Sequence, residues 1–111
     1  MGSEEIEVFE GSGNVFDDVG LQDADILLLK AQILVRIDQE IEARGLSQPQ
    51  AAKLMGAKQS DVSNLVRGRI RGYSLERLMR FLTRLDQDVD IIVKPKPKRR
   101  KAARVKGRIA A

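Results

Sequence analysis

Two short helical patterns separated by a glycine turn constrain the fold of this chain more than any other feature of its sequence. A Ser-x-x-Gln capping box at Ser47 predicts the start of the first short helix, and Gly56 predicts its end. The second pattern begins at Gln59 and ends before Gly68. Helices joined by so short a turn cross closely, and the small side chain of Ala52 fits such a crossing.

Longer amphipathic patterns flank this pair on both sides. The first predicts a helix over about 26–44 that ends at Gly45, and the second predicts a helix that begins after Ser74. Their apolar positions are Leu29, Ile33, Ile37 and Ile41 in the first helix, and Leu75, Leu78, Met79, Leu82 and Leu85 in the second. The sequence therefore predicts an all-α, four-helix domain.

Positive and negative charges lie in different parts of the 111-residue chain, although the net charge is only +4. Residues 1–25 contain eight carboxylates and no cation, which indicates an acidic N-terminal arm that is flexible or loosely docked. Residues 94–111 contain nine cations, two prolines and no carboxylate, and this composition predicts a disordered basic tail. The folded domain is therefore expected over 26–93.

The chain has no cysteine and no histidine. Disulfides, thiolate or imidazole metal ligands, and catalytic triads that use either side chain are therefore excluded. No carboxylate pair and no activated nucleophile stands out, so we expect neither an enzyme nor a bound cofactor or metal. The chain shows no signal pattern and no apolar run long enough to span a membrane, so we expect a cytoplasmic protein.

A pair of short helices with a turn glycine, set in a small four-helix domain, describes a helix-turn-helix. Segment 47–69, SQPQAAKLMGAKQSDVSNLVRGR, resembles the helix-turn-helix of the XRE family, the phage repressor-like and Cro-like regulators. The wider span of about 11–93 is similar to the HigA-type antitoxins of that family. The resemblance implies a sequence-specific DNA-binding transcriptional regulator, a repressor, with an autoregulating antitoxin as its more specific form.

The second short helix carries the residues expected to read bases. They are the exposed polar positions that remain once Val62, Leu65 and Val66 turn inward, and the resemblance places them in the DNA groove. These positions are Gln59, Ser60, Ser63 and Asn64. Gln and Asn side chains can pair bidentately with adenine, and Ser can bond any base.

Phosphate contacts are expected from residues on either side of this helix. The resemblance assigns one to Gln48 at the start of the first short helix. Lys58 stands where the family places a capping Ser or Thr, so the helix start is expected to be weaker but gains a cation. Arg67, Arg69 and Arg71 follow the helix in a loop and can reach phosphates at the groove edge.

Two further charged features bear on this surface. Asp61 favours the positive end of its helix but would lie near phosphates if it faced the DNA. Arg77, Arg80 and Arg84 are expected to form a solvated face of the fourth helix.

The β-branched segment over 89–93 predicts a C-terminal strand before Lys94 and Pro95. One strand needs a partner, which is either segment 6–9 of the arm or the same strand of a second chain. Because 26–93 is small for a lone core, we expect a homodimer that reads a near-palindromic operator with recognition helices ~34 Å apart. The residues expected at the dimer contact are Val89, Ile91, Ile92 and Val93.

Two other functions remain open at this point. The chain can be a protein-interaction module that neutralises a basic ribonuclease toxin, with the acidic arm as one contact and little specific DNA binding. It can also be a nonspecific nucleic-acid binder that acts through the basic tail, in which case sequence would hardly affect its affinity.

Overall fold

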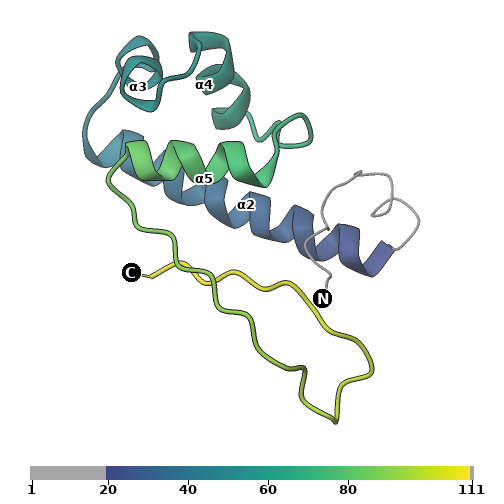
Figure 1. The fold of residues 1–111 in the computed structure, drawn as a ribbon. Helices are drawn as coiled ribbons and strands as arrows, with labels where there is room; N and C mark the ends of the chain where they lie inside the picture. The colour runs from purple at the N-terminus through teal and green to yellow at the C-terminus, as the bar shows by residue number, and fades with distance from the viewer. Residues whose placement is uncertain (1–19, 111) are drawn as a thin grey trace.

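The computed structural model describes residues 20–110, and within them the chain forms four α-helices. They are α2 (Gly20–Ala43), α3 (Gln48–Met55), α4 (Gln59–Val66) and α5 (Leu75–Arg84). Figure 1 shows α5 packed along α2, with α3 and α4 together on one side of this pair. The acidic arm up to residue 19, including the possible strand at 6–9, lies outside the described residues. None of these helices is long and apolar enough to cross a membrane.

Helix α2 begins at Gly20, earlier than the start near residue 26 that the sequence predicted. No helix breaker separates Gly20 from Ile26, and a carboxylate such as that of Asp25 is favourable inside the first turns as well as at the cap. The predicted end is confirmed, because the Leu46 N–H donates to the Ile41 carbonyl over 3.0 Å as the chain turns out of the helix.

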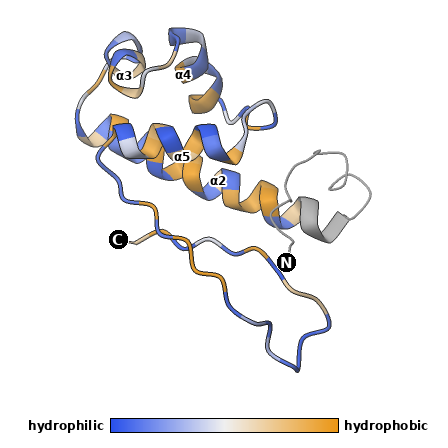
Figure 2. Cartoon of the chain, in the orientation of Figure 1, coloured by the Kyte–Doolittle hydropathy of each residue, from blue (hydrophilic) through white to orange (hydrophobic). Residues whose placement is uncertain are grey.

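One core joins the four helices. Figure 2 shows hydrophobic positions recurring along both α2 and α5, and these are the predicted stripes. The buried apolar side chains are Ile33, Ile37, Ile41, Ala51, Ala52, Met55, Val62, Leu65, Tyr73, Leu78, Phe81, Leu82 and Leu85. Each large aliphatic side chain in this set contributes about 1.5–3 kcal/mol by leaving water.

Two side chains differ from their predicted burial. Val66 was expected inward but is 40% exposed, because it lies beside the buried face of α4, which Asp61, Val62 and Leu65 form, and not on that face. Tyr73 was not expected in the core, yet it is only 6% exposed. The loop between α4 and α5 places its hydroxyl against Asp61 and Asn64 of α4.

Helix α5 ends without a glycine. Asp86 adopts a φ of 62°, and the Gln87 N–H donates to the Leu82 carbonyl over 3.0 Å in the same arrangement that closes α2. Arg44, just after α2, donates to the Leu85 carbonyl over 2.6 Å. This arginine therefore ties the end of α5 to the end of α2.

The segment that follows α5 leaves the core without forming a strand. Val89 still packs against the core, whereas Ile91, Ile92 and Val93 are 72%, 80% and 91% exposed. Within the described part of the chain no backbone edge is available to pair with this segment, so the predicted strand is not formed in a single chain.

The basic tail runs away from the helices, turns where the Arg100 N–H donates to the Pro97 carbonyl over 3.2 Å, and returns to α2 (Figure 1). There the Val105 N–H donates to Asp25 Oδ2 over 3.2 Å. A Cβ at Gly107 would collide with the Leu29 side chain, so the tail backbone lies close against α2. The residues over 94–110 form neither helix nor strand, and their disorder in solution stays a prediction.

Candidate nucleic-acid interface

Helix α3 starts where the sequence predicted. Ser47 Oγ accepts the Gln50 N–H over 3.2 Å, and Gln50 Oε1 accepts the Ser47 N–H over 2.8 Å, which completes the capping box. Pro49 lies in the first turn, where its missing N–H costs nothing. Gln48, the predicted phosphate contact, is half-buried in this same turn.

The turn between α3 and α4 depends on Gly56. Its φ of 70° is left-handed, and the Ala57 N–H donates to the Ala52 carbonyl over 2.9 Å. A Cβ at this position would lie 3.5 Å from the Arg84 guanidinium, an ordinary contact distance, so backbone conformation is the main reason for glycine. Ala51 and Ala52 are both buried, and they allow the two helices to approach closely.

The N-terminus of α4 is capped by the side chain of its third residue, Asp61, and not by the side chain of the preceding residue, Lys58. Lys58 makes no side-chain cap, as predicted, but Asp61 Oδ2 accepts the Lys58 backbone N–H over 3.0 Å. The weakness expected at this helix start is therefore partly offset. Asp61 is only 8% exposed, so its carboxylate faces the protein interior and the predicted conflict with DNA phosphates does not arise.

A polar network joins Asp61 to the loop and to α5. Tyr73 donates its hydroxyl proton to Asp61 Oδ1 over 2.9 Å, and Arg77 Nη2 lies 2.8 Å from Asp61 Oδ2. The Asn64 amide donates from Nδ2 to the Tyr73 oxygen over 3.2 Å. The Arg77 guanidinium also lies 5.0 Å from the Tyr73 ring centroid and 5.5 Å from that of Phe81.

These contacts shift two pKa values in opposite directions. Burial by itself would raise the pKa of Asp61, but the hydrogen bonds from Lys58 and Tyr73 and the charge of Arg77 outweigh it and hold the pKa below the ordinary 3.8. Burial raises the pKa of Tyr73 above its ordinary 10.0, and the adjacent Asp61 carboxylate raises it further. Asp61 is therefore ionised and Tyr73 neutral at physiological pH.

The predicted base-reading residues lie on the side of α4 opposite its buried face. Asp61, Val62 and Leu65 are buried, whereas the predicted set ranges from exposed to half-buried. Gln59 and Ser60 are exposed, and Ser63 and Asn64 are half-buried. The structure therefore brings all four residues to one outward surface of one rigid helix.

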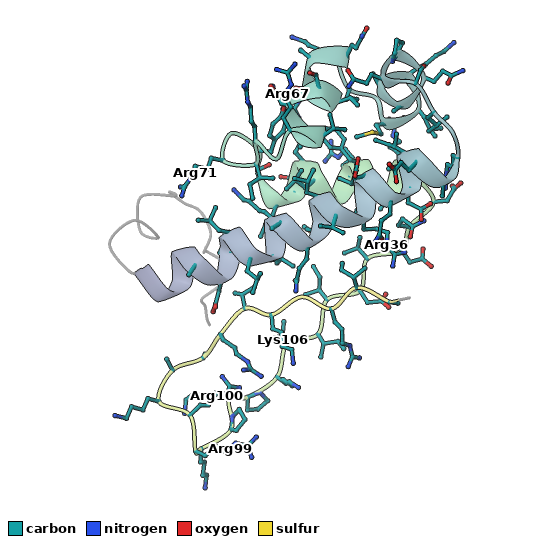
Figure 3. The ribbon with its side chains drawn as sticks, turned by 180° about the vertical axis from the view of Figure 1, so that it is seen from behind. Arg36, Arg67, Arg71, Arg99, Arg100 and Lys106 are labelled. Atoms are coloured by element: carbon teal, nitrogen blue, oxygen red, sulfur yellow. The ribbon has the colours of Figure 1, made fainter. Side chains whose placement is uncertain are left out.

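The predicted phosphate contacts surround this surface. Lys58 is exposed at the N-terminal end of α4, and Arg67 is exposed at its C-terminal end. Arg69 and Arg71 are exposed in the loop that follows, where they line an open hollow together with Leu27 of α2. Figure 3 shows Arg67 and Arg71 at the α4 end of the molecule, far from the cations of the tail.

The three α5 arginines are exposed, as predicted, but their contacts differ. Arg80 pairs with Glu76 over 3.1 Å on the surface, and the Arg84 guanidinium lies beside Gly56. Arg77 also pairs with Asp61, a contact that the sequence did not predict. Sequence reasoning missed Tyr73 altogether, although its position as the lone tyrosine one residue before a helix cap was visible in the sequence.

Comparisons with known proteins agree with this geometry. The chain matches the family model of a helix-turn-helix domain over residues 15–94. It is also similar to a solved chain provisionally named an XRE-family transcriptional regulator, at 39% identity and a TM-score of 0.73, over 79% of this chain and 99% of that one. No curated protein matches it. The chain belongs to the XRE-like helix-turn-helix family.

Proposed function

We propose that this protein is a sequence-specific DNA-binding transcriptional repressor that binds a near-palindromic duplex operator as a homodimer. The observation that carries the proposal is the outward polar surface of α4, which Gln59, Ser60, Ser63 and Asn64 form. Membership of the helix-turn-helix family and the similarity to an XRE-family regulator support DNA binding and transcriptional regulation.

In the proposed complex α4 enters the major groove and the surrounding residues fix its register. Gln59 and Asn64 discriminate bases, and each good bidentate pair is worth about 1–3 kcal/mol. Gln48, at the N-terminal end of α3, bonds a phosphate through its side chain. Lys58 and Arg67 contact phosphates on either side of the groove. Repression follows where the operator overlaps a promoter.

The exposed apolar segment after α5 supports the homodimer. Ile91, Ile92 and Val93 are β-branched, extended and among the most exposed apolar residues in the described chain. Antiparallel pairing of two copies of this segment would satisfy both backbones and cover these side chains. A two-fold dimer of this kind places the two α4 helices about one DNA turn apart, ~34 Å.

The dimer is tested by sedimentation of the wild type, of Ile92→Lys and of Val105→Lys. Val105 is an exposed apolar residue of the tail, so Val105→Lys adds the same charge outside the proposed contact. We expect a dimer for the wild type and Val105→Lys, and a monomer with unchanged helical circular dichroism for Ile92→Lys. A monomeric wild type, or a dimeric Ile92→Lys variant, contradicts the proposed dimer.

An autoregulating antitoxin is the more specific form of this proposal. Its support is the likeness of residues 11–93 to HigA-type antitoxins, which the family match over 15–94 accompanies but does not narrow to that branch. The test is co-expression with the product of the adjacent gene. A small basic ribonuclease that co-purifies with this chain supports the antitoxin role. If the product of the adjacent gene is unrelated to ribonucleases, the antitoxin role is contradicted and only the repressor role is retained.

DNA reading is tested by fluorescence anisotropy with the chain's own upstream intergenic duplex and a scrambled duplex of equal composition. Gln59→Ala removes a proposed reader, and Gln39→Ala removes the same exposed side chain from α2 as the matched control. We expect a preference for the native duplex that persists from ~50 to 200 mM salt and is reduced by Gln59→Ala alone. Equal, salt-sensitive binding to both duplexes would instead identify a nonspecific binder that acts through the tail.

A further inference from the structure

We propose that Tyr73 is a positioning residue for base reading, because together with Asp61 it fixes the orientation of the Asn64 amide. The inference rests on the proposed function and deepens it. It assigns the discrimination of one base pair in each half-site to a residue that is itself buried. Three contacts carry it, and they join α4 to Tyr73 in the loop before α5 and to Arg77 in the first turn of α5.

The direction of each hydrogen bond in this network follows from Asp61. An ionised carboxylate only accepts, so Tyr73 must donate its one hydroxyl proton to Asp61 Oδ1, 2.9 Å away. The phenolic oxygen can then accept from Asn64, whose Nδ2 lies 3.2 Å away. Rotation of the amide by a half turn would place Asn64 Oδ1 against the Tyr73 oxygen, two acceptors without a proton between them. The network therefore selects one of the two amide orientations.

Neither Tyr73 nor Asp61 has much freedom to follow a rotating amide. The Tyr73 ring is buried, and the Arg77 guanidinium lies over it, 5.0 Å from its centroid. Both carboxylate oxygens of Asp61 are engaged, because Oδ1 accepts from Tyr73 and Oδ2 accepts from Arg77 and from the Lys58 backbone N–H at 2.8 and 3.0 Å. The contact to Asn64 is therefore made from a fixed point of the core.

A fixed amide has a direct consequence for reading DNA. Adenine presents a donor at N6 and an acceptor at N7, so it pairs with an amide that offers Oδ1 and one Nδ2 hydrogen in that order. Asn64 has both groups left after one Nδ2 hydrogen is given to Tyr73. Guanine presents two acceptors at the same edge, and an amide that cannot rotate matches it poorly. Releasing the amide should therefore lower the preference for adenine over guanine.

The test measures base preference in a duplex library with a randomised central window, selected separately with each full-length chain. Tyr73→Phe removes only the hydroxyl and keeps the ring beneath Arg77. Asn64→Ala removes the proposed reader, and the double variant combines the two changes. Ile37→Val, a conservative change in the core on α2, controls for lost stability. Melting temperatures are recorded for all five proteins.

We expect Asn64→Ala to lower the adenine-over-guanine preference at one position of each half-site by about tenfold or more. Tyr73→Phe should lower it several-fold at the same position only, and should add less than about twofold in the Asn64→Ala background. The profile of Ile37→Val should match that of the wild type.

Each other outcome overturns a stated part of the account. A Tyr73→Phe profile equal to that of Ile37→Val overturns the positioning role and leaves the proposed function intact. A Tyr73→Phe effect that is spread over all positions, or that is unchanged without Asn64, also overturns it. A wild-type chain that selects no sequence overturns the proposed function, and the inference falls with it.

Discussion

The α3–α4 end of the molecule and the chain after α5 are both rich in charge, yet they use it differently. At the α3–α4 end, Asp61 accepts from Lys58, Tyr73 and Arg77 over 2.8–3.0 Å inside the protein. In the tail, Lys96 and Arg100 donate to carbonyl groups of the tail itself and remain near the surface. Charge orients specific side chains in the first region, whereas it forms a diffuse positive field in the second.

The same contrast holds for apolar residues. The helices of the α3–α4 end cover their apolar faces against α2 and α5, so this region is complete within one chain. Ile91 to Val93 have no such cover. A region complete in itself is suited to present a fixed reading surface, and an uncovered segment is suited to meet a second molecule.

The largest expected effect compares one buried and one exposed side chain. Leu78→Ala removes a fully buried residue of α5 and should lower the free energy of unfolding by about 3 kcal/mol. Ile109→Ala, in the tail, should lower it by less than about 0.5 kcal/mol. Urea unfolding followed by circular dichroism measures both values. Similar losses for the two variants would contradict the division of the molecule into a packed region and a loosely held one.

The next effect concerns the buried carboxylate. Asp61→Asn should lower the free energy of unfolding at neutral pH by about 2 kcal/mol, because it removes charge-assisted bonds to Tyr73 and Arg77. Asp86→Asn, at a carboxylate with 85% side-chain exposure, is the matched control and should change stability little.

The lowered pKa of Asp61 predicts that this carboxylate contributes to stability at neutral pH and loses that contribution in acid. The folded pKa of Asp61 lies below the ordinary 3.8, so its stabilisation is fully present above that value and is lost as the pH falls through the folded pKa. Unfolding measured from about pH 6 to 3 should therefore show a shallower acid loss for Asp61→Asn than for the wild type. If the free energy of unfolding fell equally steeply with pH in the two proteins, protonation of Asp61 would not be a cause of the acid destabilisation.

A smaller effect is expected in the turn between α3 and α4. Gly56→Ala places a Cβ on a left-handed residue and should cost about 1 kcal/mol. Gly72→Ala, in the loop before α5, is the control, because an added Cβ there meets no atom within 4 Å and the backbone is not left-handed. Thermal melting of both variants measures the difference. An unchanged melting temperature for Gly56→Ala would mean that a residue with a Cβ adopts the left-handed conformation of this turn without a measurable cost.

The smallest effect on stability is expected from removing the tail over 94–111. Its described residues bond the helices through Val105 with Asp25 and through Ala110 with Arg36, both at exposed positions, so the free energy of unfolding should change by less than about 0.5 kcal/mol. DNA affinity should fall, and the slope of log K against log salt should become shallower by about 0.9 for each phosphate that the tail no longer neutralises. A drop in stability above about 2 kcal/mol would mean that the tail belongs to the folded core.

The sequence predicted well what is decided locally. The Ser47 capping box, the turn at Gly56 and the cap at Ser74 each involve residues within a few positions of one another, and the structure has all three. The start of α2 was missed, because an acidic stretch is compatible both with an arm and with the first turns of a helix.

The polar network around Asp61 could not be predicted, because its members are far apart in the sequence. Asp61 meets Tyr73 and Arg77 across 12 and 16 positions, and only the tertiary fold brings α4 together with the loop before α5 and the first turn of α5. The pairing that we propose for the 89–93 segment is one step further from the sequence, since it would depend on a second chain. The direction of the α4 surface could be predicted because the positions of Val62 and Leu65 already determine which side of the helix is buried.

The most direct test of DNA reading by α4 is an amide chemical-shift titration of the full chain with its upstream intergenic duplex at moderate salt. We predict that the largest perturbations fall on α4, on Gln48 and on the loop with Arg69 and Arg71, with smaller ones in the tail. Perturbations confined to 94–110, with α4 unmoved and a scrambled duplex giving the same pattern, would contradict the claim that α4 reads the DNA.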